Sequence, residues 1–186
     1  ADCLHNHINA EIVTGTIRSR ANAIDYLTWT YLFRRLLCNP SYYHLLDTSK
    51  EGMTDFLAAL VERTLQDLED CECIEMEEDS IKATTLGRIA GYYYLDYTTV
   101  HMFAQRAEEI EDEEIAIEIL GDAKEFSELP VRHNEDGMNA DLAKTLRYGA
   151  GAGAMDSAHT KTRLLIQAHI GRNTLPIADY YTDLRS

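Results

Sequence analysis

The stretch MTDFLAALVERTLQDLEDCECIEMEEDSIKA, residues 53–83, decides the fold of this chain. Its first half repeats apolar residues at the i, i+3, i+4, i+7 spacing of one helix face. Two short runs follow, Cys73 to Met76 and Ile81 to Ala83, on either side of a turn-like acidic segment, residues 77–80. This pattern predicts a helix and a small β-hairpin. The apolar face is formed by Phe56, Leu57, Leu60, Val61, Leu65 and Leu68.

Two further helices are predicted before this stretch. Residues 1–15 carry apolar side chains at helical spacing, and a second helix begins at Ser19 or Asn22 and stops at the turn 39–40. Apolar residues cover nearly the whole circumference of this second helix, so we expect it to be buried. Three helices followed by a hairpin predict a winged helix over residues 1–84.

The rest of the chain, residues 85–186, is predicted to be part of a helical bundle. The sequence GAGAGA at 149–154 predicts a flexible connector. A further helix, capped by Thr182 or Asp183, is expected to begin where the sequence ends, so the bundle is expected to be truncated. The predicted helices cover residues 84–105, a segment from the acidic run 108–118 to Phe126, residues 135–146 and residues 157–172.

The composition excludes several classes of protein. Hydrophobic residues make up 45% and the formal net charge is −15, which is typical of a folded protein that repels nucleic acid on average. No stretch is apolar for long enough to span a membrane, so no membrane partner is expected. Four cysteines are too few for a disulfide scaffold, which favours reduced thiols in a nuclear or cytoplasmic protein.

Catalytic motifs are absent from the sequence. It has no phosphate-binding loop, dinucleotide-binding turn or DExH box, so we predict no catalytic residue and no cofactor in this chain. Cys71 and Cys73 have the wrong spacing for a structural zinc site, so no metal is expected and Cys73 is predicted to be a small buried residue. Tyr92, Tyr93 and Tyr94 could stack nucleic-acid bases, but at least one ring, Tyr93 with Tyr97, is expected to pack inside.

The most concentrated polar segment is PVRHNED, residues 130–136. Its arginine could hold a phosphate, but the favoured interpretation is a corner in which Arg132 pairs with Glu135 or Asp136. The predicted helix over 157–172 adds a weak basic strip. The candidate nucleic-acid contacts are Arg132, His133, Lys161, Arg163 and Arg172.

Several long strings resemble one family. DYLTWTYLFRRLLCNPSYY (25–43) and TLGRIAGYYYLDYTTVHMF (85–103) resemble the winged-helix and sec-homology bundle segments of the large tandem-cassette DExH helicases of superfamily 2. This family includes the spliceosomal and the signal-cointegrator helicases. LPVRHNEDGMN (129–139) and LPIADYYTDL (175–184) are nearer to the signal-cointegrator type.

The resemblance implies a non-catalytic accessory region of an ATP-dependent 3′–5′ helicase. Such a region braces the motor domains of the same polypeptide and positions single-stranded RNA or DNA, together with other complex subunits. ATP and magnesium would be bound by the parent helicase, outside this chain. An independent acidic scaffold for protein–protein interaction is the alternative function.

Overall fold

The computed structural model describes residues 3–43, 45, 47–78 and 80–185 of the chain. The backbone divides into two compact units, residues 1–101 and 102–186. The helix α6 (Tyr97–Arg106) crosses this division. Each unit has its own hydrophobic core, and the two are described separately.

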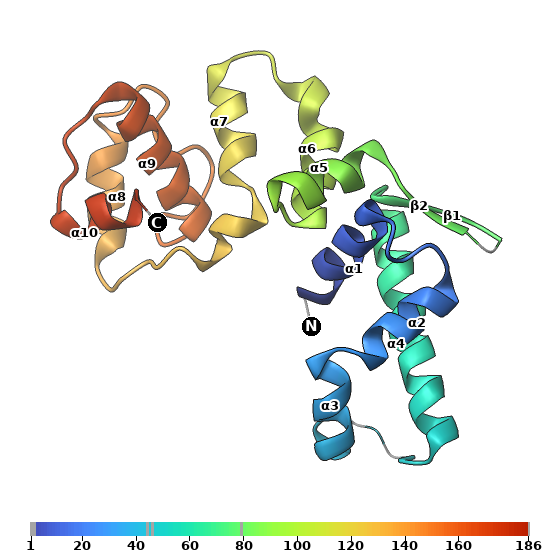
Figure 1. The fold of residues 1–186 in the computed structure, drawn as a ribbon. Helices are drawn as coiled ribbons and strands as arrows, with labels where there is room; N and C mark the ends of the chain where they lie inside the picture. The colour runs from blue at the N-terminus through green and yellow to red at the C-terminus, as the bar shows by residue number, and fades with distance from the viewer. Residues whose placement is uncertain (1–2, 44, 46, 79, 186) are drawn as a thin grey trace. The chain divides into compact units, whose positions relative to one another are not determined.

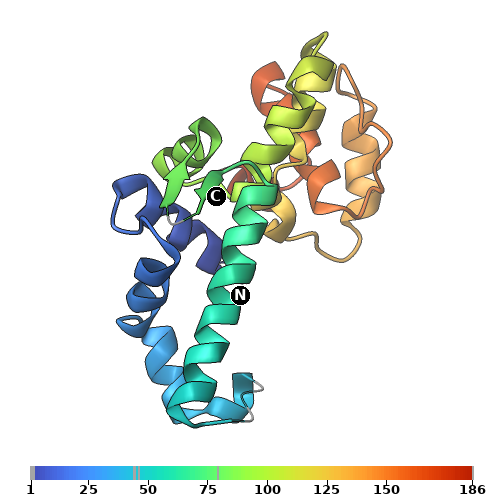
Figure 2. The same ribbon diagram turned by 90° about the vertical axis from the view of Figure 1, so that its right-hand side faces the viewer.

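The first unit is a winged helix, as the sequence predicted (Figure 1). Its long helix α4 runs into a hairpin, and the remaining helices pack along α4 and beside the hairpin (Figure 2). The elements are α1 (Cys3–Thr14), α2 (Arg20–Thr28), α3 (Tyr31–Cys38), a 3-10 turn (Pro40–Tyr43), α4 (Lys50–Asp70), β1 (Ile74–Glu77), β2 (Ser80–Ala83) and α5 (Thr85–Tyr93).

The helix α4 and the hairpin follow from local chemistry. Ser49 caps α4, since its hydroxyl accepts a hydrogen bond from the backbone N–H of Gly52 at 3.0 Å. The two strands pair antiparallel, with Ile74 opposite Ala83. The predicted turn between them includes Asp79, which lies outside the described residues. Among the residues that are described, no helix is both long and apolar enough to cross a bilayer.

The core of this unit forms where α1, α4 and α5 meet the hairpin. Asn9 of α1 is buried and donates a hydrogen bond to the backbone oxygen of Gly87 in α5 at 2.9 Å. Gly87 also lies directly against the carbonyl oxygen of Cys73, so that any side chain at position 87 would overlap this oxygen. Cys73 is fully buried, which confirms its prediction as a core residue.

The segment predicted as the second helix forms two helices, α2 and α3, so the prediction of one continuous helix is wrong. The chain breaks at Trp29 and Thr30, where Thr30 is extended and its hydroxyl donates to the carbonyl oxygen of Leu27 at 2.6 Å. The prediction that this segment is buried is also wrong. Trp29 is 83% exposed and Tyr31 is 75% exposed, because the break turns α3 away from the axis of α2.

The predicted helix 84–105 is likewise interrupted. Tyr94 adopts a left-handed conformation (φ 57°) that ends α5 before α6 begins. Tyr92, Tyr93 and Tyr94 are all well exposed, so the expectation that Tyr93 packs inside is wrong. Tyr97 is half-buried and stacks on His5 with 4.9 Å between ring centroids, as expected for a packed ring.

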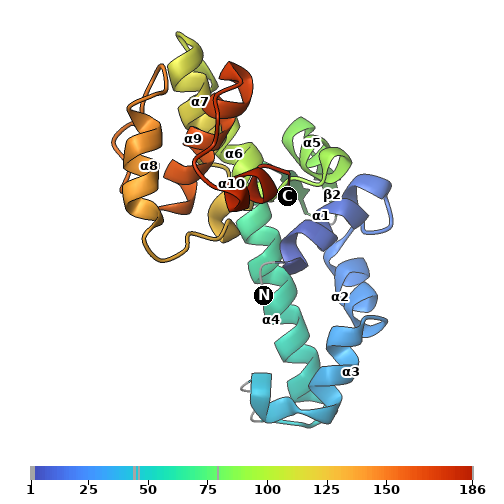
Figure 3. The same cartoon turned by 90° about the vertical axis from the view of Figure 1, so that its left-hand side faces the viewer.

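The second unit is an all-helical cluster around α9 (Figure 3). Asp112 caps the first helix of this unit, which is shorter than the predicted segment ending at Phe126. Most of the acidic run lies on exposed turns before that helix. The elements after α6 are 3-10 turns at Ala107–Glu109 and Lys124–Glu128, and helices α7 (Glu113–Gly121), α8 (Glu135–Ala143), α9 (Ala158–Gly171) and α10 (Ala178–Asp183).

Two other predictions for this unit are wrong. The segment 149–154 is folded into turns rather than left as a free connector: Ala150 is 8% exposed, and the Gly149 carbonyl accepts a hydrogen bond from Gln167 at 2.8 Å. Thr182 and Asp183 do not cap a new helix, since they form the last turn of α10.

Candidate nucleic-acid interface and a buried ion network

Arg132 lies in the loop before α8, and its guanidinium is hydrogen-bonded to two buried carboxylates, with the exposed Asp179 carboxylate 3.6 Å from Nε. Its Nη1 donates to Glu135 at 3.0 Å, and Nη1 and Nη2 donate to the two oxygens of Asp183 at 2.7 and 2.9 Å. The Arg132 backbone N–H donates to the other oxygen of Glu135 at 3.0 Å. The pair with Glu135 confirms the predicted salt-bridged corner. The pair with Asp183 was not predicted.

Lys161 of α9 lies at the centre of the same cluster. Its side chain is fully buried, and Nζ donates to Glu135 at 2.6 Å, to Asp183 at 2.8 Å and to the carbonyl oxygen of Pro130 at 2.7 Å. An ammonium has three protons to donate, so these acceptors satisfy it completely. We call Arg132, Glu135, Lys161 and Asp183 the buried ion network.

The network pairs two cations with two anions, and this pairing changes the pKa values of the two carboxylates. Hydrogen bonds from Arg132 and then Lys161 lower the pKa of Asp183 to about 2. Burial alone would raise the pKa of Glu135, but hydrogen bonds from Lys161 and Arg132 outweigh it and lower the pKa. Both carboxylates are therefore ionised at neutral pH. The network ties the loop before α8 to α9 and α10.

A polar pair extends the packing around the network. Tyr180 is fully buried, and its ring centroid lies 4.7 Å from Nζ of Lys161. Its hydroxyl donates a hydrogen bond to Asn139 at 2.7 Å. Burial, and then the nearby Glu135 carboxylate, raise the pKa of Tyr180 to about 12, so its hydroxyl remains a donor. Asn139 in turn donates to the carbonyl oxygen of Met155 at 2.7 Å.

Arg163, two residues after Lys161 and on a different side of α9, is also paired. Its Nη2 donates to Asp122, and Arg106 donates to the other oxygen of Asp122 at 2.8 Å. The Arg163 side chain is only 11% exposed. Asp122 therefore links α6, α7 and α9 within the second unit.

His133 and Arg172 are exposed, as is Arg132 despite its ion pairs. Arg172 has a left-handed backbone (φ 53°) at the C-cap of α9. The structure brings Arg132 and Lys161 together on shared carboxylates, while Arg163 belongs to a separate cluster. Contact with nucleic acid stays a prediction for all five residues, and of these five, within the described part of the chain, His133 and Arg172 alone have no carboxylate within ion-pair distance.

We did not predict from the sequence that Glu135, Lys161 and Asp183 form one cluster, although the sequence indicated that Lys161 is buried. Lys161 stands three and four positions before Leu164 and Leu165, so it lies on the buried face of α9. A lysine on such a face requires carboxylates on a facing element.

The four cysteines are free thiols, and burial raises the pKa of the Cys73 thiol to about 12. Within the described ranges, no three His, Cys, Asp or Glu side chains converge as metal ligands would. The fold thus defines a winged-helix protein with a second helical unit stabilised by buried ion pairs.

Comparison with known proteins agrees with this architecture. Residues 1–78 match the Winged Helix-turn-helix domain family, and residues 83–186 match the Sec63 Brl domain family. The chain belongs to the Sec63 Brl domain family, preceded by a winged helix, and is a helicase-associated region of the DExH-box type.

Three relatives illustrate the similarity. Activating signal cointegrator 1 complex subunit 3 of Homo sapiens is 51% identical over 98% of this chain, and the DExH-box ATP-dependent RNA helicase DExH14 of Arabidopsis thaliana is 49% identical over 98%. The U5 small nuclear ribonucleoprotein 200 kDa helicase of Homo sapiens is 42% identical over 93%. In each case the chain spans 8% of the length of the relative.

Proposed function

We propose that this chain is a non-catalytic accessory region of an ATP-dependent RNA helicase, in which it braces the motor domains and helps to position the translocated strand. The observation that carries the proposal is the order of the two matched families along 98% of the chain, shared with relatives whose names include an RNA helicase and helicase-complex subunits.

The physical character of the chain supports a bracing role. Buried ion pairs tie the elements of the second unit together at fixed positions, which suits a part that transmits geometry. The net charge of −15 disfavours autonomous binding to phosphates. The sequence has no phosphate-binding loop, so its residues do not fit ATP and magnesium, which belong to the motor domains in this proposal.

The partners in this proposal are the motor domains of the same polypeptide, single-stranded RNA through the parent helicase, and subunits of its complex. A nuclear location follows from the small nuclear ribonucleoprotein in the name of one relative. A cytoplasmic location is retained beside it.

Purified chain provides the test. It should not turn over ATP, and it should bind a single-stranded RNA of about 20 nucleotides weakly, with a dissociation constant no tighter than the 10⁻⁴–10⁻⁶ M of nonspecific contacts. ATP turnover that persists through successive purification steps would refute the proposal.

A second candidate is an independent acidic scaffold, and it is favoured by one observation. The start of α7 and the turns before it carry exposed acidic residues, namely Glu108, Glu109 and the segment 111–114. A scaffold of this kind would capture a basic protein at low ionic strength and release it as salt rises. Salt-sensitive capture by the chain alone, together with normal helicase activity after its deletion from the parent, would favour the scaffold.

A further inference from the structure

Large apolar side chains are exposed together where α2 passes into α3. Trp29 is 83% exposed, Tyr31 75%, Tyr42 70% and Leu37 51%. The helix α3 lies beside the N-terminal half of α4, at the end of the first unit away from the hairpin (Figure 1, Figure 3). We call Trp29, Tyr31, Arg34, Arg35, Leu37 and Tyr42 the α3 face.

Three side chains of the α3 face follow one another along it. Tyr31 and Arg35 are one helical turn apart on α3. The Arg35 guanidinium carbon lies 5.6 Å from the centroid of the Tyr42 ring, and Tyr42 meets Tyr43 edge-on at 5.1 Å. A cation thus lies over an exposed aromatic ring.

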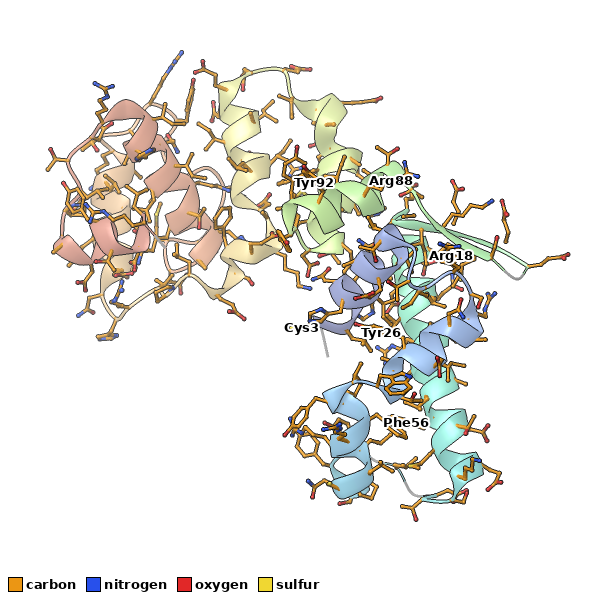
Figure 4. All side chains as sticks on the ribbon, in the orientation of Figure 1. Cys3, Arg18, Tyr26, Phe56, Arg88 and Tyr92 are labelled. Carbon is orange, nitrogen blue, oxygen red and sulfur yellow. The ribbon has the colours of Figure 1, made fainter. Side chains whose placement is uncertain are left out.

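The backbone conformation at the start of α3 keeps this face exposed. Thr30 ends α2 and starts α3, and Leu36 on the opposite side of α3 is 1% exposed, which anchors the helix to the core. Within the first unit, Tyr26 of α2 and Phe56 of α4 lie on the inner side of this segment (Figure 4). The aromatic residues of the α3 face are therefore held in solvent by a well-packed helix.

The charge of the α3 face is opposite to that of the chain. The sequence has 32 acidic residues, yet none between Asp25 and Asp47. Among the described residues, neither Arg34 nor Arg35 has a carboxylate within ion-pair distance, whereas Arg20 pairs with Glu62 and Arg132 pairs with several carboxylates. Two unpaired guanidinium groups beside exposed rings offer a complement to an acidic surface.

We propose that the α3 face is the docking surface for an apolar, acid-bearing surface of the ATPase-containing part of the same polypeptide; this inference rests on the proposed accessory function. Trp, Tyr and Arg are the residues that most often dominate the free energy of protein–protein binding. The α3 face presents all three, with Leu37 as an aliphatic contact. Through this face the first unit binds the ATPase-containing part.

Two other occupants fit less well. Nucleic acid would meet only two arginines on a chain of net charge −15, and one face of the Tyr42 ring is already covered by Arg35. A symmetric pair of copies would bring four arginines into one interface, and residues 26–46 contain no carboxylate to match them. A protein surface that carries carboxylates satisfies both the rings and the guanidinium groups.

Site-specific photocrosslinking in the full polypeptide tests the inference. Tyr31→p-benzoylphenylalanine should give an intramolecular crosslink to a peptide in the ATPase-containing part. The same replacement at Tyr94, which is 93% exposed but lies outside the α3 face, is the matched control and should not give that crosslink. A crosslink from position 31 to RNA, to a second copy or to a different protein would overturn the inference, as would no crosslink.

A functional variant separates this inference from the proposed function. Combined Trp29→Ala and Arg35→Glu should slow duplex unwinding by the full polypeptide at least about tenfold, as expected for loss of two binding anchors. Combined Tyr94→Ala and Arg88→Glu should change it less than about twofold. If deletion of residues 1–186 abolishes unwinding but the α3-face variant leaves it unchanged, the docking inference fails while the accessory function stands.

Discussion

Nζ of Lys161 lies 2.6 Å from Oε2 of Glu135, and neither side chain is more than 2% exposed. A buried lysine is tolerated only when its charge and all of its protons are matched, and Glu135, Asp183 and the Pro130 carbonyl provide that match. This pair explains why α8, α9 and α10 form one cluster. It also shows that a lysine expected to face a phosphate is committed inside the fold.

Lys161→Met should lower the free energy of unfolding of the chain by about 3–5 kcal/mol, since it removes one of the two cations that match the buried carboxylates of Glu135 and Asp183. The measurement is urea denaturation followed by circular dichroism. Lys144→Met is the control, because Lys144 pairs with Asp141 on the surface at 2.8 Å, with both side chains more than 70% exposed, and should cost at most about 1 kcal/mol.

Removal of the stranded charges should restore part of this loss. Lys161→Met combined with Glu135→Gln and Asp183→Asn should be more stable than Lys161→Met alone, because amides cost less to bury than carboxylates. A single Lys161→Met variant within about 1 kcal/mol of the wild type would contradict the assignment of a buried ion network.

The network also predicts acid sensitivity. The folded-state pKa of Asp183 is about 2, below the ordinary value of 3.8, so its contribution to stability is present above pH 4 and is lost as the pH falls from about 4 to 2. The lowered pKa of Glu135 acts in the same direction. Asp183→Asn should be less stable at pH 5 and should lose about 2 kcal/mol less than the wild type between pH 4 and 2.

Denaturation midpoints measured at pH 5, 4, 3 and 2 check this prediction. Asp141→Asn is the matched control, since the Asp141 side chain is 79% exposed, and its pH profile should follow that of the wild type. Parallel profiles for Asp183→Asn and the wild type would rule out the ionised network.

Two glycine substitutions should have opposite effects on stability, because Gly87 is closely packed in the winged helix and Gly137 is not. Gly87→Ala should destabilise the chain by about 1–3 kcal/mol, because the added carbon would overlap the Cys73 carbonyl oxygen. Gly137→Ala in α8 should stabilise it by about 0.5–1 kcal/mol, since the added carbon meets nothing within 4 Å and alanine favours the helix. Thermal unfolding of both variants measures these effects, and equal melting temperatures would refute the packing argument.

The sequence predicted the winged helix because its signals are local. The apolar spacing of α4, the acidic turn of the hairpin and the turn at residues 39–40 each depend on neighbouring residues. The breaks at Trp29 and Tyr94 were not predicted, because an aromatic residue has no strong preference for ending a helix.

The candidate site shows the same distinction. Arg132 and Glu135 are three residues apart, and their pair was predicted from that spacing. Asp183 lies 51 residues from Arg132, so its pairing depends on how α10 folds back onto the loop before α8. No local pattern encodes that arrangement, although the position of Lys161 on the apolar face of α9 indicated that carboxylates must face it.

Duplex unwinding by the parent polypeptide is the most direct test of the accessory role. Unwinding of a short RNA duplex with a 3′ overhang would be compared between the full polypeptide and a version from which residues 1–186 are deleted, with ATP turnover recorded in parallel. We predict that the deletion abolishes unwinding while the deleted version still hydrolyses ATP. Undiminished unwinding after the deletion would contradict the account.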